Sequence, residues 1–409
     1  MSRLPDNYLF ILFVGFFIVS CDSLLPEEPA ESDLLDGPVE GLTPEQQRIF
    51  LEGDIAFSDE IFTPSSGLGP IFVASSCGSC HPGDGKGHPS NALFRFSKTE
   101  NGVIEDRLLD KGGPQLQHRS IPGFTPEEFP ADANGRSKVV APAVTGLGFL
   151  AAVPDQTLLD LVEQQRNEGL VSGVVQWVNP PEFFQPAPGQ VSNNGQYIGR
   201  FGKKAGAINV LQQVVNAYNQ DMGITTDFRM DDPVNFSVSS DQIDVAGDPE
   251  LPAATVNSVA FYIRTLKAPI PRNTENADVI RGKVLFEDIN CSACHLPTMT
   301  TGLSDVPVFS DQEFHPYTDL LLHDMGPGLD DQHVDGNEFS YEWRTPPLWG
   351  IGLSKDAQGG QYFLMHDGRA NSIEAAILAH GGEAEQMKLA FQELSNQEQS
   401  QLIKFLESL

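Results

Sequence analysis

The sequence predicts a mainly α-helical protein with extensive loops, in which two similar units pack together and a loop-rich segment is inserted between them. Three observations predict this class. The chain has 409 residues, enough for more than one domain with its own core. A Cys-x-x-Cys-His string occurs once in each half of the chain. The 38 glycines and 30 prolines indicate many turns and long loops.

The composition is that of an acidic globular protein. Hydrophobic residues make up 40% of the chain, and 25 Lys and Arg residues stand against 56 Asp and Glu residues, a formal net charge of −31. Such a surface repels polyphosphate, so we expect no nucleic-acid binding. The charge favours a basic or neutral macromolecular partner, or it simply keeps an exported protein solvated.

The N-terminus reads as an export signal. Residues 8–20 form an apolar run of 13 residues, which is too short for a permanent membrane helix and typical of a secretory signal over residues 1–20. The four residues that end with Cys21 resemble the bacterial lipobox, which predicts lipidation of that cysteine; an ordinary signal peptide is the alternative. Residues 21–44 are acidic and contain proline, as in a solvated tether. We expect a periplasmic or cell-envelope protein that Cys21 anchors to a bacterial membrane.

Both Cys-x-x-Cys-His strings have the attachment signature of c-type haem. Two thiols reach the vinyl groups of one porphyrin, and the adjacent histidine lies under the iron as its fifth ligand. The sequence therefore predicts two covalently bound haems and no disulfide. Zinc binding, a thioredoxin-like dithiol and exported disulfides are the alternatives. The predicted residues are Cys77, Cys80 and His81 for one haem and Cys291, Cys294 and His295 for the other, with His81 and His295 as iron ligands.

A second repeat lies ahead of each haem motif. Gly53 and Phe57 in the first unit, and Gly282 and Phe286 in the second, share the pattern Gly-x-x-x-Phe. On a helix this spacing puts glycine and aromatic on one face, and the glycine allows a second helix to cross closely.

These repeats divide the chain into predicted domains. They are an N-terminal haem c domain over residues 45–172, an inserted segment over 173–253 and a C-terminal haem c domain over 254–409. The insertion lacks strong periodicity, apart from a predicted helix near residues 208–218. In the C-terminal domain, residues 395–409 are predicted to form an amphipathic helix that begins with a capping box.

His380 is the candidate for the sixth position of the C-terminal haem. A capping box at residues 371–374 predicts a helix that ends at a glycine pair, Gly381 and Gly382. His380 shares a face of this helix with Ile373 and Ile377, so its imidazole points where the apolar residues point. The alternatives are a solvated histidine at the helix end and coordination by a methionine instead.

Several longer strings resemble one family. Residues 317–329, 342–353 and 363–385 are similar to the bacterial di-haem oxidoreductases, a group of the peroxidase type that is sometimes loosely called thiol oxidoreductases; residues 198–205 and 221–225 also match that group. The group is distantly similar to di-haem cytochrome c peroxidases and to MauG, which matures a protein-derived quinone cofactor. The resemblance covers most of residues 45–409.

The resemblance implies further assignments. His81 and His295 match the proximal ligands. In the related peroxidases the distal ligand of the C-terminal haem, a methionine there and a tyrosine in MauG, follows a His-Asp-Gly string by 14 residues. Here that string begins at His366, and the count reaches His380. A His295/His380 haem would be low-spin, with a lower potential than a His/Met haem.

At the N-terminal haem the resemblance implies a reactive pocket. No histidine occurs between His88 and His118, so the iron is either open or closed by one of these two. The segment that matches the distal pocket of the relatives offers Gln115 and Gln117 as hydrogen-bond donors to peroxide and Glu128 as a proton carrier. A polar surface loop is the alternative for this segment.

These observations predict an exported di-haem c-type oxidoreductase of the peroxidase type. Electrons would pass from a low-spin C-terminal haem to a reactive N-terminal haem, where peroxide or another small oxidant reacts. The electron donor would be a cytochrome or a cupredoxin-like protein, and calcium, which the related peroxidases bind, is possible here. The alternative function is an electron-transfer cytochrome with both irons six-coordinate and no peroxidase activity.

Overall fold

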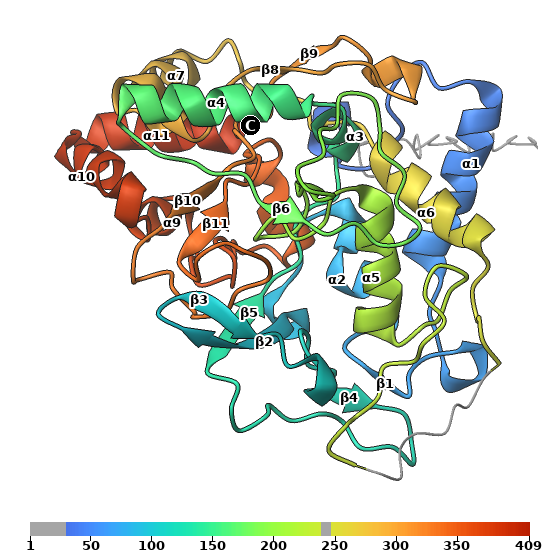
Figure 1. The fold of residues 1–409 in the computed structure, drawn as a ribbon. Helices are drawn as coiled ribbons and strands as arrows, with labels where there is room; N and C mark the ends of the chain where they lie inside the picture. Colours follow the sequence, from blue (N-terminus) through green and yellow to red (C-terminus); the bar gives the residue numbers. More distant parts are fainter. Residues whose placement is uncertain (1–29, 239–246) are drawn as a thin grey trace, which may run out of the picture.

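The computed structural model describes residues 30–238 and 247–409, and its fold is mainly α with long connecting loops (Figure 1). Helices account for 37% of the structure and strands for 13%, which confirms the coarse fold class. The predicted signal peptide and the predicted lipidation site at Cys21 lie outside the described residues. In the part of the chain that is described, no helix is both long enough and apolar enough to cross a membrane.

The helices differ widely in length and are joined by short strands. The helices are α1 Pro44–Asp54, α2 Cys77–Cys80, α3 Leu147–Ala151, α4 Asp155–Glu168, α5 Val210–Met222, α6 Ala253–Thr265, α7 Ala277–Asp288, α8 Ser354–Ala357, α9 Ile373–Leu378, α10 Glu385–Glu393 and α11 Asn396–Ser408. The strands are β1 Ile71–Phe72, β2 Leu93–Glu100, β3 Val103–Asp106, β4 Arg119–Ser120, β5 Gly135–Val139, β6 Trp177–Val178, β7 Tyr197–Ile198, β8 Met299–Thr300, β9 Glu313–Phe314, β10 Leu322–Asp324 and β11 Glu342–Arg344.

In the N-terminal unit, α1 crosses α6 at the predicted glycine. A Cβ atom placed on Gly53 would lie 2.1 Å from the Ser258 carbonyl oxygen and 2.6 Å from the Tyr262 Cβ atom. Only glycine therefore permits this crossing. One turn later Phe57 packs on Tyr262, with ring centroids 5.4 Å apart, and both belong to the largest buried apolar cluster of the unit.

The C-terminal unit repeats the same crossing with α7 and α11. A Cβ atom on Gly282 would lie 2.0 Å from the Gln401 carbonyl oxygen and 2.7 Å from the Phe405 Cβ atom. Phe286 then packs on Phe405, with centroids 5.4 Å apart. Helix α11 begins at the predicted capping box, since Ser395 accepts from the Glu398 amide. The predicted role of both glycines is therefore confirmed.

The packing does not follow the predicted boundaries of the inserted segment. Helix α5 confirms the helix predicted near residues 208–218, but its Val214, Val215 and Tyr218 are buried in the same cluster as α1 and α6. Helix α5 is therefore part of the N-terminal core. Helix α6, which the prediction assigned to the domain over 254–409, also packs with α1. Apolar burial, which periodicity alone could not locate, places both helices in the N-terminal unit.

The predicted tether is shorter than expected. Within residues 30–44, the Val39 amide donates to the Thr265 carbonyl at 2.7 Å, and the Lys267 amide donates to the Gly37 carbonyl at 3.0 Å. Leu42 is buried in the N-terminal core. The described end of the predicted tether is thus attached along the end of α6, with Leu42 as its buried residue, while most of its other side chains stay exposed or half-buried.

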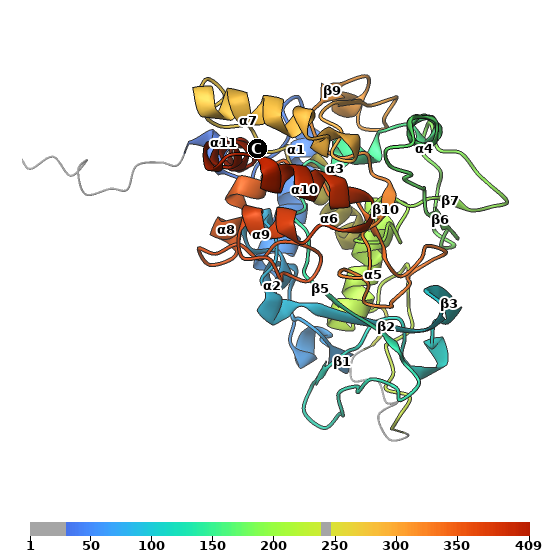
Figure 2. The same cartoon turned by 90° about the vertical axis from the view of Figure 1, so that its left-hand side faces the viewer.

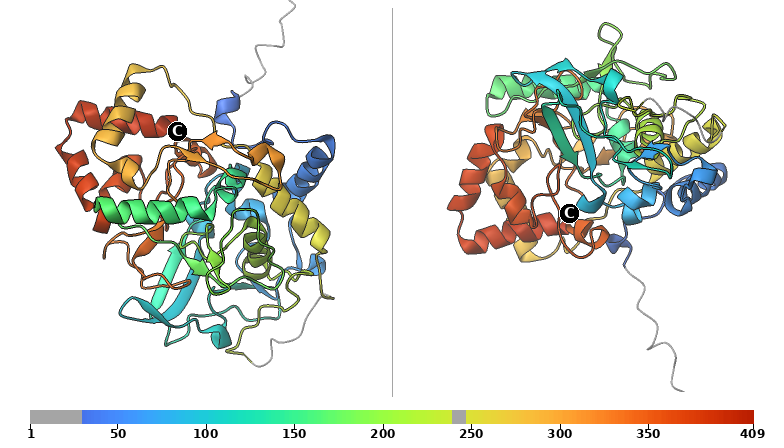
Figure 3. Two further views of the ribbon diagram at one scale, coloured as in Figure 1. Left: turned by 45° about the horizontal axis from the view of Figure 1, so that its top comes forward. Right: turned by 90° about the horizontal axis from the view of Figure 1, so that it is seen from below.

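The two units lie side by side, with α1, α5 and α6 at one end and α7, α10 and α11 at the other (Figures 1 and 2). Helix α4 runs along one side of the molecule, as the tilted view of Figure 3 shows. The largest sheet has the strand order β3-β2-β5, is antiparallel, and pairs Phe96 with Arg136. The other sheets have two strands each. Loops and short strands connect the two helix pairs.

We predict that Gly282→Ala destabilises the protein. The added methyl group would meet the backbone of α11, and overpacking of this kind costs about 1–3 kcal/mol, or a Tm lower by roughly 2–10 °C. Thermal unfolding followed by circular dichroism measures the change. Gly328→Ala is the matched control, because a Cβ atom there meets nothing within 4 Å. An unchanged Tm for Gly282→Ala would contradict the crossing.

Candidate di-haem site

One continuous cavity joins the two units. Its volume is about 740 Å³, within the range of about 300–1,000 Å³ typical of ligand and cofactor sites. Both predicted haem motifs line it, and so does His380. The lining residues from the motifs are Cys77, Cys80, His81, Cys291, Cys294 and His295.

Each motif forms a single helical turn. Ser76 caps α2, and the His81 amide donates to the Cys77 carbonyl at 2.9 Å. In the second motif the His295 amide donates to the Cys291 carbonyl at 3.1 Å. One turn of helix puts residues three apart on one side. The spacing of the motif therefore presents both thiols and then the imidazole to the cavity.

The two motif histidines are held neutral. Burial lowers the pKa of His81 to about 4, and the nearby Lys203 adds to this effect. Burial also lowers the pKa of His295 to about 4, and the next contribution comes from His380. Iron coordination requires a neutral imidazole, so both side chains have the protonation state of a ligand at neutral pH.

Three of the four motif thiols do not have the environment of a redox or zinc site. The four cysteines among the described residues are free. Burial raises the pKa of Cys77, Cys80 and Cys291 to about 12, whereas reactive or zinc-binding cysteines need a stabilised thiolate. The two cysteine pairs do not meet at one point in the described structure, but the Cys294 thiol lies with Asp319 and His323 in a group whose ligand atoms fall within 4.8 Å of one another. These features argue against a zinc site shared by the two pairs and against a reactive dithiol at the first motif.

His380 and His295 have the tautomer that coordination needs. The Nδ1 atom of His380 donates to the Ala376 carbonyl at 2.7 Å, and that of His295 donates to the Tyr317 carbonyl at 3.0 Å. A proton fixed on Nδ1 leaves the Nε2 lone pair of each ring available for a metal. His380 lies just beyond the helix on which it was expected, because α9 ends at Leu378. The helix also begins one residue later than its predicted capping pattern, since Ser372, not Asn371, accepts from a backbone amide, that of Ala375.

The segment predicted to supply the N-terminal pocket is buried, not a surface loop. Gln115 is 1% exposed and Gln117 is 3% exposed. The Gln115 amide donates to Asp221 at 2.6 Å and to the Gln220 carbonyl at 3.0 Å, and the Gln117 amide donates to the same carbonyl at 3.0 Å. Gln115 and Asp221 line the cavity. Asp221 also raises the pKa of the Cys77 thiol, which places it beside the first motif.

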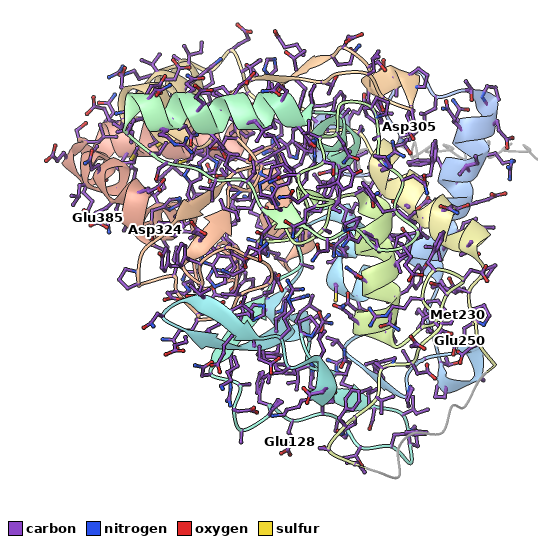
Figure 4. All side chains as sticks on the ribbon, viewed as in Figure 1. Glu128, Met230, Glu250, Asp305, Asp324 and Glu385 are labelled. Atoms are coloured by element: carbon purple, nitrogen blue, oxygen red, sulfur yellow. The ribbon has the colours of Figure 1, made fainter. Side chains whose placement is uncertain are left out.

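The predicted proton carrier Glu128 does not line the cavity, and neither does its buried neighbour Glu127. Glu128 is exposed and lies at the outer edge of the molecule (Figure 4). Its neighbour Glu127 is buried and accepts from the Gln117 amide at 2.8 Å. Burial raises the pKa of Glu127 to about 8 and that of Asp221 to about 6. An irregular loop has no periodicity, so the sequence does not indicate which of two adjacent glutamates is buried.

Neither histidine considered for closing the N-terminal iron lines the cavity. His88 pairs with Ser90, with the Nδ1 and Oγ atoms 2.8 Å apart, and its ring packs on Phe363. His118 packs edge-on against Phe94. The structure therefore brings a second histidine to the C-terminal motif, as predicted, and leaves these two outside the cavity wall.

Basic side chains line the cavity between the two motifs. Lys86, Lys203 and Arg344 belong to its wall, and in the described part of the chain none of them lies within ion-pair distance of a carboxylate. Burial lowers the pKa of Lys203 to about 8 and that of Arg344 to about 10. Cations are rarely placed together without counter-ions, least of all in a chain with a net charge of −31. The propionate groups of haem would supply the missing negative charge.

Three carboxylates elsewhere bear on the prediction of calcium. The ligand atoms of Asp232, Asp248 and Glu250 lie within 4.8 Å of one another; the Thr225 hydroxyl donates to Asp248, and its backbone amide donates to Glu250. Oxygen ligands of this type suit a hard cation. Acidic clusters are also common without an ion, so calcium stays a prediction.

The buried Glu127 predicts a pH-dependent stability. Its pKa in the folded protein is about 8, above the ordinary value of about 4.3, so the folded state binds the proton more tightly. Its contribution to stability is complete below about pH 4.3 and is lost as the pH rises to about 8. Glu127→Gln should therefore flatten the fall in Tm over this range.

Thermal unfolding between pH 5 and pH 8.5 measures this difference. Glu128→Gln is the matched control and should follow the unmodified protein, because its side chain is exposed. Parallel curves for the unmodified protein and Glu127→Gln would contradict the assignment of a buried protonated carboxyl at this position.

Three comparisons relate the chain to known proteins. Hydrazine synthase of Kuenenia stuttgartiensis, in a structure pressurised with 20 bar xenon, is 15% identical, covers 99% of this chain and 100% of its own, and has a TM-score of 0.41. A MauG-like protein associated with microbial copper homeostasis is 14% identical, covers 94% of each chain and has a TM-score of 0.37. The chain has no match among curated proteins. The family model described as "di-haem oxidoreductase, putative peroxidase" matches residues 132–409, and the chain belongs to this family of di-haem oxidoreductases.

Proposed function

We propose that the protein is an exported, lipid-anchored di-haem c-type oxidoreductase of the peroxidase type, with one haem bound at each motif. The observation that carries the proposal is the asymmetry of the cavity. Both motifs line it, but His380 is proposed to join only the second, which its electrostatic contribution to the lowered pKa of His295 supports. Bound haem would supply one-electron chemistry and, at an iron with an open position, reaction with peroxide.

The chain's own residues would hold the two cofactors in different ways. Cys77 and Cys80 would carry the first covalently, and Cys291 and Cys294 the second. His81 and His295 would be the proximal ligands. His380 would close the second iron, which suits electron transfer, because a six-coordinate site has no position for a substrate.

Around the first motif, the chain offers groups that can hold and move a proton. Gln115 is fixed by its hydrogen bonds to Asp221 and the Gln220 carbonyl, so its carboxamide is positioned before any ligand enters. Asp221, which lines the cavity, has a pKa of about 6; Glu127, which contacts Gln117 and does not line the cavity, has a pKa of about 8. General acids and bases work best when their pKa is near the working pH.

Export and partner choice complete the proposal. The predicted signal sequence and lipobox support attachment to a bacterial membrane through Cys21, and haem attachment of the c type takes place outside the cytoplasm. The acidic surface supports a basic redox partner such as a cytochrome or a cupredoxin-like protein. Peroxide is the proposed oxidant.

Low-temperature electron paramagnetic resonance of the oxidised protein, with and without peroxide, tests the proposal. One high-spin and one low-spin ferric signal are expected, and peroxide should remove the high-spin signal. Two low-spin signals that ignore peroxide, in both the oxidised and the half-reduced protein, would instead identify an electron-transfer cytochrome without peroxidase activity.

We predict that His380→Ala converts the low-spin haem to high spin. The variant loses the sixth ligand while both haems stay attached through their cysteines, so the low-spin signal should disappear. Electron paramagnetic resonance and a haem stain after denaturing electrophoresis measure the two outcomes. His315→Ala is the control, because His315 is exposed and pairs with Thr298 outside the cavity. A retained low-spin signal in His380→Ala would remove His380 as the ligand.

A further inference from the structure

The turn that follows His380 is in direct backbone contact with a second turn of the C-terminal unit. Gly382 follows α9, and Gly326 follows β10; both have left-handed backbone angles, with φ of +55° and +74°. A Cβ atom on Gly326 would lie 2.7 Å from the Gly382 amide nitrogen, and one on Gly382 would lie 2.2 Å from the Asp324 carbonyl oxygen. The two backbones are therefore in direct contact, and neither turn can shift without the other.

A buried charged cluster crosses the same contact. His323, in β10, is 2% exposed, and its Nδ1 atom lies 2.8 Å from a carboxylate oxygen of Glu383, three residues after His380. Its Nε2 atom lies 2.8 Å from a carboxylate oxygen of Asp319, which is fully buried. An imidazole that donates from both nitrogens carries a positive charge, so the cluster alternates negative, positive and negative groups.

The cluster also fastens the turn to the N-terminal half of the chain. The Ser172 amide and hydroxyl donate to the two oxygens of Glu383 at 3.0 Å and 2.6 Å. Gln165 in α4 donates to Asp319 at 2.9 Å and accepts from the Gly173 amide at 2.8 Å. Gly173 lies so close to the His323 ring that a Cβ atom there would be 2.8 Å from its Cε1 atom. The hydrogen bonds of the Glu383 carboxylate to Ser172 and His323 therefore reach outside the turn that it belongs to.

We propose that the cluster of Asp319, His323 and Glu383 holds His380 in its coordinating position. Glu383 and His323 are then positioning residues. The inference rests on the proposed ligand role of His380. The α9 helix has only 6 residues, and the turn after it contains two glycines, so local structure alone restrains His380 weakly. Glu383 supplies the restraint from the far side of the turn.

The test uses the full protein with both haems attached and cyanide as the probe. Cyanide binds a ferric iron only where the sixth position is free, so its apparent affinity for the C-terminal haem scales with the fraction of molecules in which His380 is released. Titration is followed on the low-spin signal assigned to the His295/His380 haem. Glu383→Gln weakens a charge-assisted hydrogen bond to a buried imidazolium, and should raise this apparent affinity by about 10–100-fold. Ser172→Ala removes one donor to Glu383 and should raise it by a smaller factor.

The matched control is Glu385→Gln. Glu385 lies two residues further on at the outer edge of the molecule, labelled in Figure 4, and pairs with Lys388 without touching His323. Its substitution should leave the cyanide affinity unchanged. A Glu383→Gln protein with a lower Tm but an unchanged cyanide affinity would have only a structural defect, and this result would overturn the inference. An equal rise in cyanide affinity in Glu385→Gln would also overturn it.

His380→Ala separates failure of the inference from failure of the proposed function. If His380→Ala binds cyanide tightly at a second iron while Glu383→Gln does not, His380 is the ligand and the cluster does not hold it. If His380→Ala behaves like the unmodified protein, the ligand assignment itself is wrong, and the inference falls with it.

Discussion

The close crossing of two helices at a glycine is the constraint on which both units depend. At Gly53 and again at Gly282, the backbone of a second helix occupies the place where a side chain would begin. Because the crossing fixes the aromatic one turn later, Phe57 and Phe286 are each held against a partner ring. Phe57 in turn packs on the His81 ring, with centroids 5.8 Å apart, and the Phe286 ring packs on Tyr317, whose carbonyl accepts from His295. The position of each motif histidine thus follows from a contact between backbones.

The cavity between the units has basic side chains in its wall, although the chain as a whole is acidic. The chain as a whole is strongly acidic, yet Lys86, Lys203 and Arg344 converge on one cavity without carboxylate partners among the described residues. Burial lowers the pKa of all three, and repulsion from a neighbouring cation adds to this effect for Lys86 and Lys203, so their charged forms are disfavoured. Bound anionic groups would relieve this cost. Cofactor binding and folding are therefore expected to be coupled, as they are for other chains whose interior is completed by a bound group.

The sequence was most informative where function depends on short spacing. The Gly-x-x-x-Phe repeat and the capping box of α11 each span only a few residues, and the structure has both as predicted. The two Cys-x-x-Cys-His strings are equally short, and each forms one helical turn at the cavity. Contacts between segments far apart in the sequence could not be predicted. Nothing in α1 indicates that its partner is α6, some two hundred residues away, and the domain boundary was therefore misplaced. In the loops, where side chains follow no period, Glu128 was chosen in place of the buried Glu127.

The same motif serves two sites that differ only in what surrounds it. Near His295 the chain places a second imidazole and a fully charged cluster, Asp319, His323 and Glu383, in which the hydrogen bonds of His323 outweigh burial and keep both carboxyl pKa values low. Near the first motif it places Asp221, whose pKa burial raises. Charges that are already paired hold a structure rigid, whereas carboxyls close to neutrality can exchange protons. The division of labour between a closed site and a reactive one would therefore be set by burial and pairing of carboxylates, since the attachment sequences themselves are alike.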